Sequence, residues 1–163
     1  MKRSSIGIIV VVLIGLLALH GLAAETSSAV NKLGKISIGM TKNQVIKLLG
    51  QPNSPKDYDF IYGAGDNEMI VTFDNKKKVE SIIIKGKDLT LDVAGIKIGS
   101  PASLVEGTFG KPEYVKKYIF FKREVWSYPS SNVYFSCKDG KVVSFAVSCC
   151  NYFSFKKKVG SKI

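Results

Sequence analysis

The sequence predicts an α+β fold built from two tandem repeats. Residues 36–52 read ISIGMTKNQVIKLLGQP and residues 96–112 read IKIGSPASLVEGTFGKP, an ungapped offset of 96 − 36 = 60 residues. Each copy has the apolar spacing and the Gly-x-Pro ending of a short helix, and antiparallel strand patterns follow each. Self-similarity at a fixed period marks a repeated supersecondary unit. We therefore expect two units, each a short helix followed by a meander of three to four strands, forming one sheet with both helices on one face.

The two helices are expected to begin on different signals. In the first, Thr41 has the position of an N-cap, Gln44 completes a capping box, and Gly50 has the position of the left-handed residue after the helix. In the second, Ser100 is expected as the N-cap and Pro101 as the first helical residue. Neither helix is long enough to be stable alone, so each has to pack on the strands that follow it.

Strands are expected where apolar and polar residues alternate between turn signals. Lys138-Asp139-Gly140 is a clear hairpin signal, and the short connections favour an antiparallel meander. The expected strands cover residues 58–62, 68–73 and 78–85 in the first unit, and 114–121, 124–128, 132–137 and 142–149 in the second.

The two ends of the chain are expected to lie outside the repeats. The first 24 residues have the basic start, apolar run and small residues of a secretory signal peptide, with an uncleaved membrane anchor as the alternative. The protein is therefore expected to be secreted or to reside in the cell envelope. The expected boundaries are a signal peptide at 1–24, a flexible lead-in at 25–35, the repeats at 36–91 and 92–150, and an aromatic and basic tail at 151–163.

Composition argues against several classes of function. The net charge of +11 falls to +9 when Lys2 and Arg3 leave with the signal peptide. The same cleavage removes His20, the one histidine of the chain, which excludes Ser-His or Cys-His catalysis and His-ligated zinc. We expect no enzyme, no cofactor and no metal, and export argues against a nucleic-acid partner.

The cysteines form an odd set in a compartment that permits disulfides. If Lys138-Asp139-Gly140 is a turn, Cys149 lies roughly 26 Å from Cys137 at about 3.3 Å per residue. A disulfide needs Cα atoms within about 7 Å. We expect Cys149 to be a buried free thiol, and the pairing of Cys137, Cys149 and Cys150 stays open.

The first helix and its flanks resemble a known family. The matching residues are Ile38-Gly39-Met40-Thr41, Gln44-Val45, Leu48-Leu49-Gly50 and Pro52. This motif, followed by a meander, resembles the BamE/SmpA-like (SmpA/OmlA-like) domain, and two in tandem resemble the architecture of beta-lactamase inhibitory proteins. The resemblance covers about residues 36–150, although Ser100-Pro101 replaces Met-Thr in the second copy. It implies the fold and leaves the function open, because the family includes assembly factors as well as inhibitors.

Three apolar runs suggest that both faces of the sheet are covered. A sheet with helices on one side needs apolar residues on that face only, yet the runs Ile82-Ile83-Ile84, Ile119-Phe120-Phe121 and Phe145-Ala146-Val147 are apolar at consecutive positions. The second face is expected to be covered by the C-terminal tail, by a second copy or by a partner protein.

The first functional hypothesis is a non-enzymatic, exported module that binds another protein through the helix-free sheet face. An inhibitor of an extracellular hydrolase is one concrete form of it. The alternative is an envelope-associated structural protein held by lysine clusters on anionic wall polymer or lipid. The residues expected at the protein interface are Tyr62, Trp126, Tyr128 and Tyr134. The residues expected at an anionic surface are Lys76, Lys77, Lys78, Lys156, Lys157 and Lys158.

Overall fold

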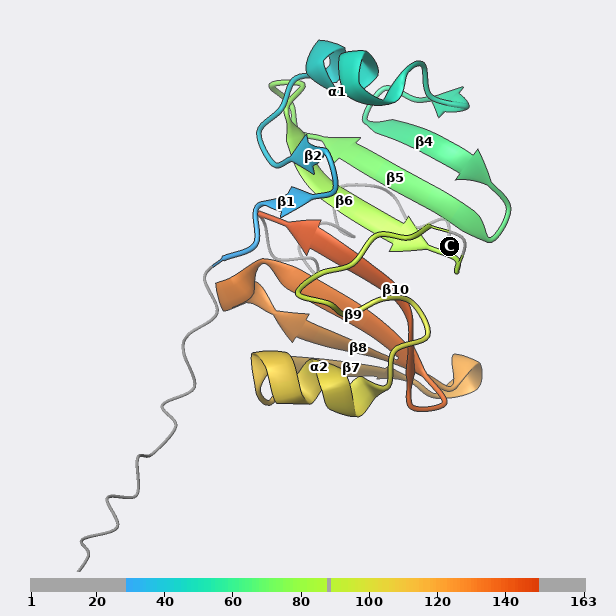
Figure 1. Cartoon of the computed structure of the whole chain (residues 1–163), viewed down its shortest axis with the longest axis vertical. Helices are drawn as coiled ribbons and strands as arrows, with labels where there is room; N and C mark the ends of the chain where they lie inside the picture. Colours follow the sequence, from blue (N-terminus) through green and yellow to red (C-terminus); the bar gives the residue numbers. More distant parts are fainter. Residues whose placement is uncertain (1–28, 88, 150–163) are drawn as a thin grey trace, which may run out of the picture.

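The structure, a computed structural model, describes residues 29–87 and 89–149. Within them, eight strands form one antiparallel sheet in the order β3-β4-β5-β6-β10-β9-β8-β7. Helices α1 (Lys42–Leu49) and α2 (Ala102–Phe109) lie on the same face of this sheet (Figure 1). The predicted fold class is confirmed. The strands of the sheet are β3 (Ser54–Pro55), β4 (Asp59–Ala64), β5 (Asn67–Phe73), β6 (Val79–Lys85), β7 (Tyr114–Tyr118), β8 (Arg123–Tyr128), β9 (Val133–Lys138) and β10 (Lys141–Ser148).

Strands β6 and β10 join the two halves at the centre of the sheet. They run antiparallel, with Ile83 opposite Ala146, so the halves are related by an approximate twofold axis through this seam. The same backbone hydrogen bond occurs in both halves: the N–H of Gly39 donates to the carbonyl of Val79 at 2.8 Å, and that of Gly99 to Val142 at 2.7 Å. Both glycines have φ near +90° (86° and 91°), a region that glycine enters without steric cost.

One hydrophobic core lies between the sheet and the helices. Val45 of α1 and Val105 of α2, equivalent positions of the repeat, are both fully buried in it. A separate hairpin of β1 (Lys32–Leu33) and β2 (Ile36–Ser37) covers the same face. Leu33 is 2 % exposed and belongs to the core, so the lead-in predicted over 25–35 is too long.

The helix starts agree with the prediction in one half only. Thr41 caps α1, and Gln44 completes the capping box. The N-cap of α2 is Pro101, which makes no side-chain cap bond. The prediction for Ser100 is wrong because its hydroxyl accepts a hydrogen bond from the backbone N–H of Lys97 at 3.0 Å instead.

The largest departure from the predicted strands is between β7 and β8. The strand expected over 114–121 ends at Tyr118, and Ile119–Phe121 form a short 3-10 turn, η1. Lys122 then reverses the chain in the left-handed conformation, with φ +46°. This apolar run therefore lies on neither face of the sheet.

Candidate functional site

The β7–β8 hairpin is longer than its counterpart in the first half. In each half a tyrosine hydroxyl donates to the carbonyl of the glycine that ends the helix: Tyr62 to Gly50 and Tyr128 to Gly110, both at 3.1 Å. The partners are 12 residues apart in the first half and 18 in the second, a difference of 18 − 12 = 6. The additional residues lengthen the hairpin, since β3 has two residues where β7 has five.

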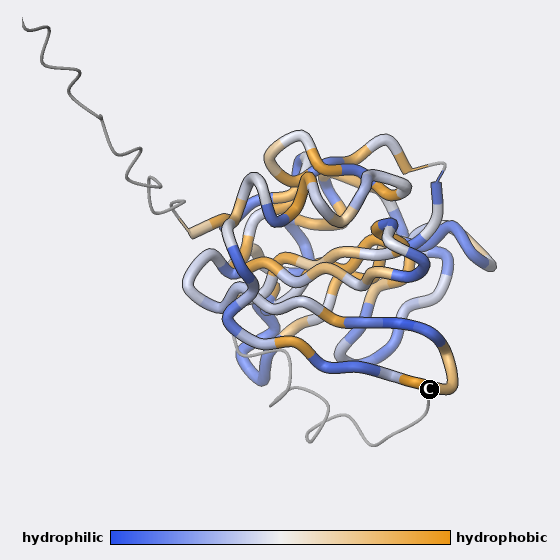
Figure 2. Tube along the Cα trace, turned by 90° about the horizontal axis from the view of Figure 1, so that it is seen from below, coloured by the Kyte–Doolittle hydropathy of each residue, from blue (hydrophilic) through white to orange (hydrophobic). Residues whose placement is uncertain are grey.

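The end of this hairpin carries three consecutive large apolar side chains with little cover. Ile119 is 85 % exposed, Phe120 99 % and Phe121 71 %. Scattered apolar residues are ordinary on protein surfaces, but a contiguous group marks an interaction site. Figure 2 shows the hairpin at its lower edge as two largely hydrophilic strands that meet in a hydrophobic bend. We call Ile119–Phe121 the apolar tip.

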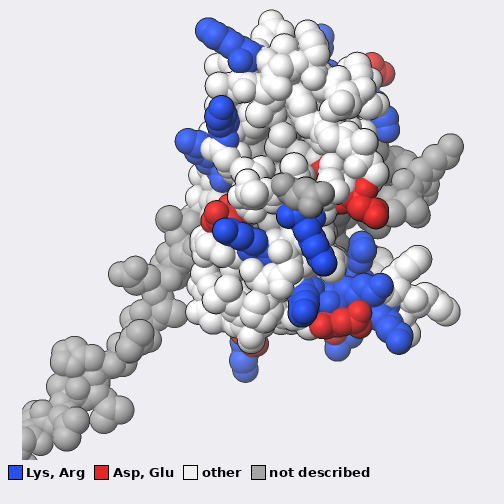
Figure 3. Space-filling model, turned by 45° about the vertical axis from the view of Figure 1, so that its right-hand side comes forward, with Lys and Arg blue, Asp and Glu red and all other residues white. Residues whose placement is uncertain are grey.

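Cationic residues surround the apolar tip. Lys116 and Lys117 precede it, and Lys122 and Arg123 follow it. Arg123 lies opposite Lys138 in the register of β8 with β9, which continues the positive charge along this end of the sheet. Figure 3 shows Lys and Arg side chains gathered over the second half, in the lower part of the view, with a carboxylate group among them.

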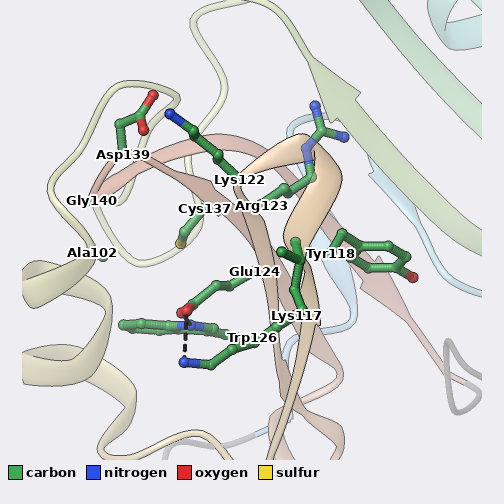
Figure 4. Close-up of a pocket in the computed structure, with 11 residues that line it drawn as sticks. Ala102, Lys117, Tyr118, Lys122, Arg123, Glu124, Trp126, Cys137, Asp139 and Gly140 are labelled. Atoms are coloured by element: carbon green, nitrogen blue, oxygen red, sulfur yellow. Dashed lines mark hydrogen bonds and ion pairs between the residues drawn. The ribbon is translucent and has the colours of Figure 1, made fainter.

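A pocket of about 350 Å³ lies beside the tip end of the hairpin, between β8, the end of β9 with the turn that follows it, and the start of α2 (Figure 4). Glu124 anchors it. Its carboxylate accepts a hydrogen bond from Nε1–H of Trp126 at 3.0 Å and pairs with Nζ of Lys117 at 3.1 Å. The bond from Trp126, and then Lys117, lower the pKa of Glu124. Lys117 and Glu124 form the second cross-strand pair from the turn, so these contacts fix the hairpin close to its tip.

Cys137 is the thiol that lines this pocket. It is 4 % exposed, and burial raises its pKa to about 11, so it stays protonated near neutral pH. Cys149 is exposed, and the prediction that it is buried is wrong because the ladder between β10 and β6 ends at Ser148. Cys150 lies outside the described residues. Within residues 29–87 and 89–149, no cluster of three potential metal-ligating side chains occurs.

Three of the four aromatic residues predicted on the helix-free face lie on the opposite face. Tyr62 and Tyr128 reach the helix ends, and Trp126 packs against the core. The placement was wrong because the strand alternation, which sets the face of each residue, depends on where each turn falls. Tyr134 lies outside the core cluster on the helix-free face, opposite Ser127, but it is only 3 % exposed. That face therefore offers no exposed tyrosine at this position.

The predicted lysine clusters lie away from the apolar tip. Lys76–Lys78 are exposed in the β5–β6 turn, where the carboxylate of Asp74 accepts hydrogen bonds from the N–H groups of Lys76 and Lys78. The strand registers place this turn at one end of the sheet and the β7–β8 tip at the other. Lys156–Lys158 lie outside the described residues.

The apolar tip is absent from the predicted site residues because the sequence pattern predicts a strand through Ile119–Phe121. Two signals for it were present. The run Lys-Lys-Tyr-Ile-Phe-Phe-Lys-Arg places charges on both sides of an apolar group. The spacing between helix and strand also differs between the repeats at this point.

No protein-family model matches the sequence, and no curated protein matches it. Among solved structures, the chain is similar to a DUF4309 family protein (YjgB) from Bacillus subtilis subsp. subtilis str. 168. The two are 14 % identical with a TM-score of 0.48, over 66 % of this chain and 77 % of that one. No conclusion about function follows from a likeness of this size.

Proposed function

We propose that the protein is an exported, non-enzymatic binding module whose binding element is the β7–β8 hairpin. The observation that carries the proposal is the exposure of Ile119, Phe120 and Phe121 at 85, 99 and 71 %. Burying one such side chain contributes roughly 1.5–3 kcal/mol. The three adjacent side chains stay exposed in the folded chain, so a partner that covers them would gain this free energy on binding. Export is supported by the signal-peptide pattern of residues 1–24, as in the BamE/SmpA-like proteins that the repeat resembles.

The hairpin is held in shape before any partner binds. Five cross-strand pairs, from Tyr114 opposite Ser127 to Tyr118 opposite Arg123, define its register. The Glu124 contacts with Lys117 and Trp126 add side-chain bonds close to the tip. A preformed element loses less conformational entropy on binding, which favours affinity.

The chemistry of the adjacent pocket supports a role without catalysis. A general acid or base works best with a pKa near the working pH, and a thiol nucleophile needs a lowered pKa. Here the shifts go the other way: Trp126 and Lys117 lower the pKa of Glu124, and burial raises that of Cys137.

The two hypotheses drawn from the sequence differ in their support. Protein binding through the helix-free face, including inhibition of an extracellular hydrolase, is weakened by the burial of Tyr134 and the inward position of the other three aromatics. Attachment to an anionic surface is supported by the cations around the apolar tip. In the part of the chain that the structure describes, no helix has the length and apolar character to cross a membrane.

The experiment is retention of the exported protein in the envelope fraction of its cells. The test variant replaces the apolar tip, and the control replaces three large apolar residues that are partly exposed elsewhere on the surface, so both exchange three such side chains for serine. Wild type and control should stay with the envelope, whereas the tip variant should be released, with an unchanged unfolding midpoint. Equal retention of the tip variant would overturn the proposal. The test variant is I119S/F120S/F121S and the control is L48S/Y58S/L104S.

A further inference from the structure

We infer that the target of the apolar tip is the interface of an anionic lipid bilayer. Ile119, Phe120 and Phe121 would enter the apolar zone just below the headgroups, and the flanking Lys and Arg side chains would contact lipid phosphates. The inference rests on the proposed function, because it names the target of the same hairpin.

The shape of the tip favours a bilayer over a folded partner. η1 is a single turn that Lys122 closes, and the chain projects there as a convex bend. Phe120 is 99 % exposed, so no residue of the described chain encloses it. A bilayer accommodates a convex apolar projection because its acyl chains rearrange around it, whereas a protein partner would need a preformed apolar groove of matching shape.

The order of residues along the hairpin matches the layers of a membrane surface. Lys117 lies two residues before Ile119, and Lys122 follows Phe121 directly. At about 3.3 Å per residue, the charges lie within roughly 7 Å of the apolar tip. Interfacial segments bury their apolar face about 5–10 Å deep and extend Lys and Arg side chains back to the headgroups.

Tyr118 occupies the boundary between the two zones. Its ring is half-buried, and Nζ of Lys116 lies 5.2 Å from the ring centroid. Tyrosine is enriched at membrane–water interfaces because one end of the ring is apolar and the other is polar. A cation at this ring lies at the level expected for lipid phosphates.

The local charge selects anionic over neutral lipid. The hairpin carries four cationic residues and one carboxylate, Glu124, which is already paired with Lys117. Juxtamembrane cations of this kind are attracted by the negative potential of anionic lipid and lose that attraction in salt. An anionic wall polymer would bind the same cations but would leave the apolar tip in water. A reporter at the tip therefore distinguishes a lipid target from a polymer target.

The test uses the full exported chain with a fluorescent reporter at the tip. Trp126 is the only tryptophan, and it lies at the base of the hairpin. Phe120→Trp adds a second one at the tip. With vesicles of phosphatidylcholine and phosphatidylglycerol, we expect the Phe120→Trp protein to show a blue shift and quenching by brominated acyl chains beyond those of the wild type. Vesicles of phosphatidylcholine alone should give a smaller shift.

Co-sedimentation with the same vesicles tests the roles of tip and charge. The tip variant I119S/F120S/F121S should partition at least about tenfold less than the wild type. K116Q/K122Q spares the Glu124 pair and should reduce the preference for anionic vesicles. L48S/Y58S/L104S should bind like the wild type. All four proteins share the same termini, so any membrane attachment through residues 1–28 or 150–163 is equal in each comparison.

The outcomes separate the inference from the proposed function. Equal vesicle binding by the tip variant and the wild type, or no response of the Phe120→Trp reporter to anionic vesicles, would overturn the lipid inference. If the tip variant is released from the envelope fraction but the wild type does not bind vesicles, the target is a protein or a polymer. The hairpin then remains the binding element, and the lipid inference is wrong.

Discussion

Tyr62 and Tyr128 make the same hydrogen bond in two different surroundings. Each hydroxyl donates at 3.1 Å to the carbonyl of the glycine after a helix, one of the carbonyls that a helix end leaves without an intrahelical partner. Tyr128 is 2 % exposed, and Tyr62 is only half-buried. Burial raises the pKa of both hydroxyls, so both stay protonated donors well above neutral pH.

Tyr128→Phe should therefore cost more than Tyr62→Phe. Loss of a hydrogen bond in a buried setting lowers the free energy of unfolding by about 0.5–1.5 kcal/mol, and water replaces the bond more readily near the surface. Urea unfolding of the two variants measures the difference. An equal or larger loss for Tyr62→Phe would contradict this account.

Cys137 should be unreactive in the folded protein. In a C149S/C150S variant it is the remaining thiol, and its burial together with a pKa of about 11 should keep a disulfide reagent from modifying it near pH 8 until urea unfolds the chain. Rapid modification of the native protein would show that the pocket opens.

The same thiol predicts a pH dependence of stability. The folded-state pKa of about 11 lies above the ordinary value of 9.0, so the unfolded chain loses its proton first as the pH rises. The contribution to stability is complete below pH 9 and is lost between pH 9 and 11. Unfolding at several pH values should show a steeper decline for the wild type than for Cys137→Ala; identical slopes would contradict the assignment.

At the scale of single elements, local chemistry could be predicted and tertiary context could not. The α1 capping box of Thr41 and Gln44 involves neighbours three residues apart, so the sequence alone predicts it. The cap of α2 could not be found that way, because Ser100 has a competing partner in the backbone of Lys97. Likewise, the apolar tip continues the strand-like pattern of β7, and only the turn at Lys122 decides that it leaves the sheet.

Gly107→Ala should stabilise α2. Gly107 is helical, and an added Cβ meets no atom within 4 Å, so the gain is the helix propensity difference of about 0.5–1 kcal/mol. Gly99→Ala is the matched comparison: space is also open there, but φ is +91°, so the change should destabilise. Thermal unfolding of both variants measures the two signs, and a lower midpoint for Gly107→Ala would contradict the argument.

At the scale of the whole molecule, the two halves share one core across the β6–β10 seam. The single sheet with both helices on one face followed from the repeat, because each unit alone has too small a core. Which aromatic residues faced outward could not be derived, since a one-residue error in register moves a side chain to the other face.

Separate halves should therefore fail to fold. A cut in the linker after residue 87 leaves Ile82 and Ile84 of β6 without Val147 and Phe145 of β10, and exposes a long unpaired edge strand on each fragment. Circular dichroism of each fragment in urea should show no cooperative transition. A sigmoidal transition from either fragment alone would contradict this view.

The twofold relation defines a position in the first half that is equivalent to the β7–β8 hairpin, and that position carries no long hairpin. In the first half the equivalent connection, residues 56–58 between β3 and β4, is short and lies at the opposite end of the sheet. A second copy of residues 118–123 transplanted there would point away from the first, and the two could not share one bilayer. Such a molecule should join two vesicles and make a suspension turbid, whereas the natural chain, with one longer hairpin, should bind one vesicle only and leave the suspension clear.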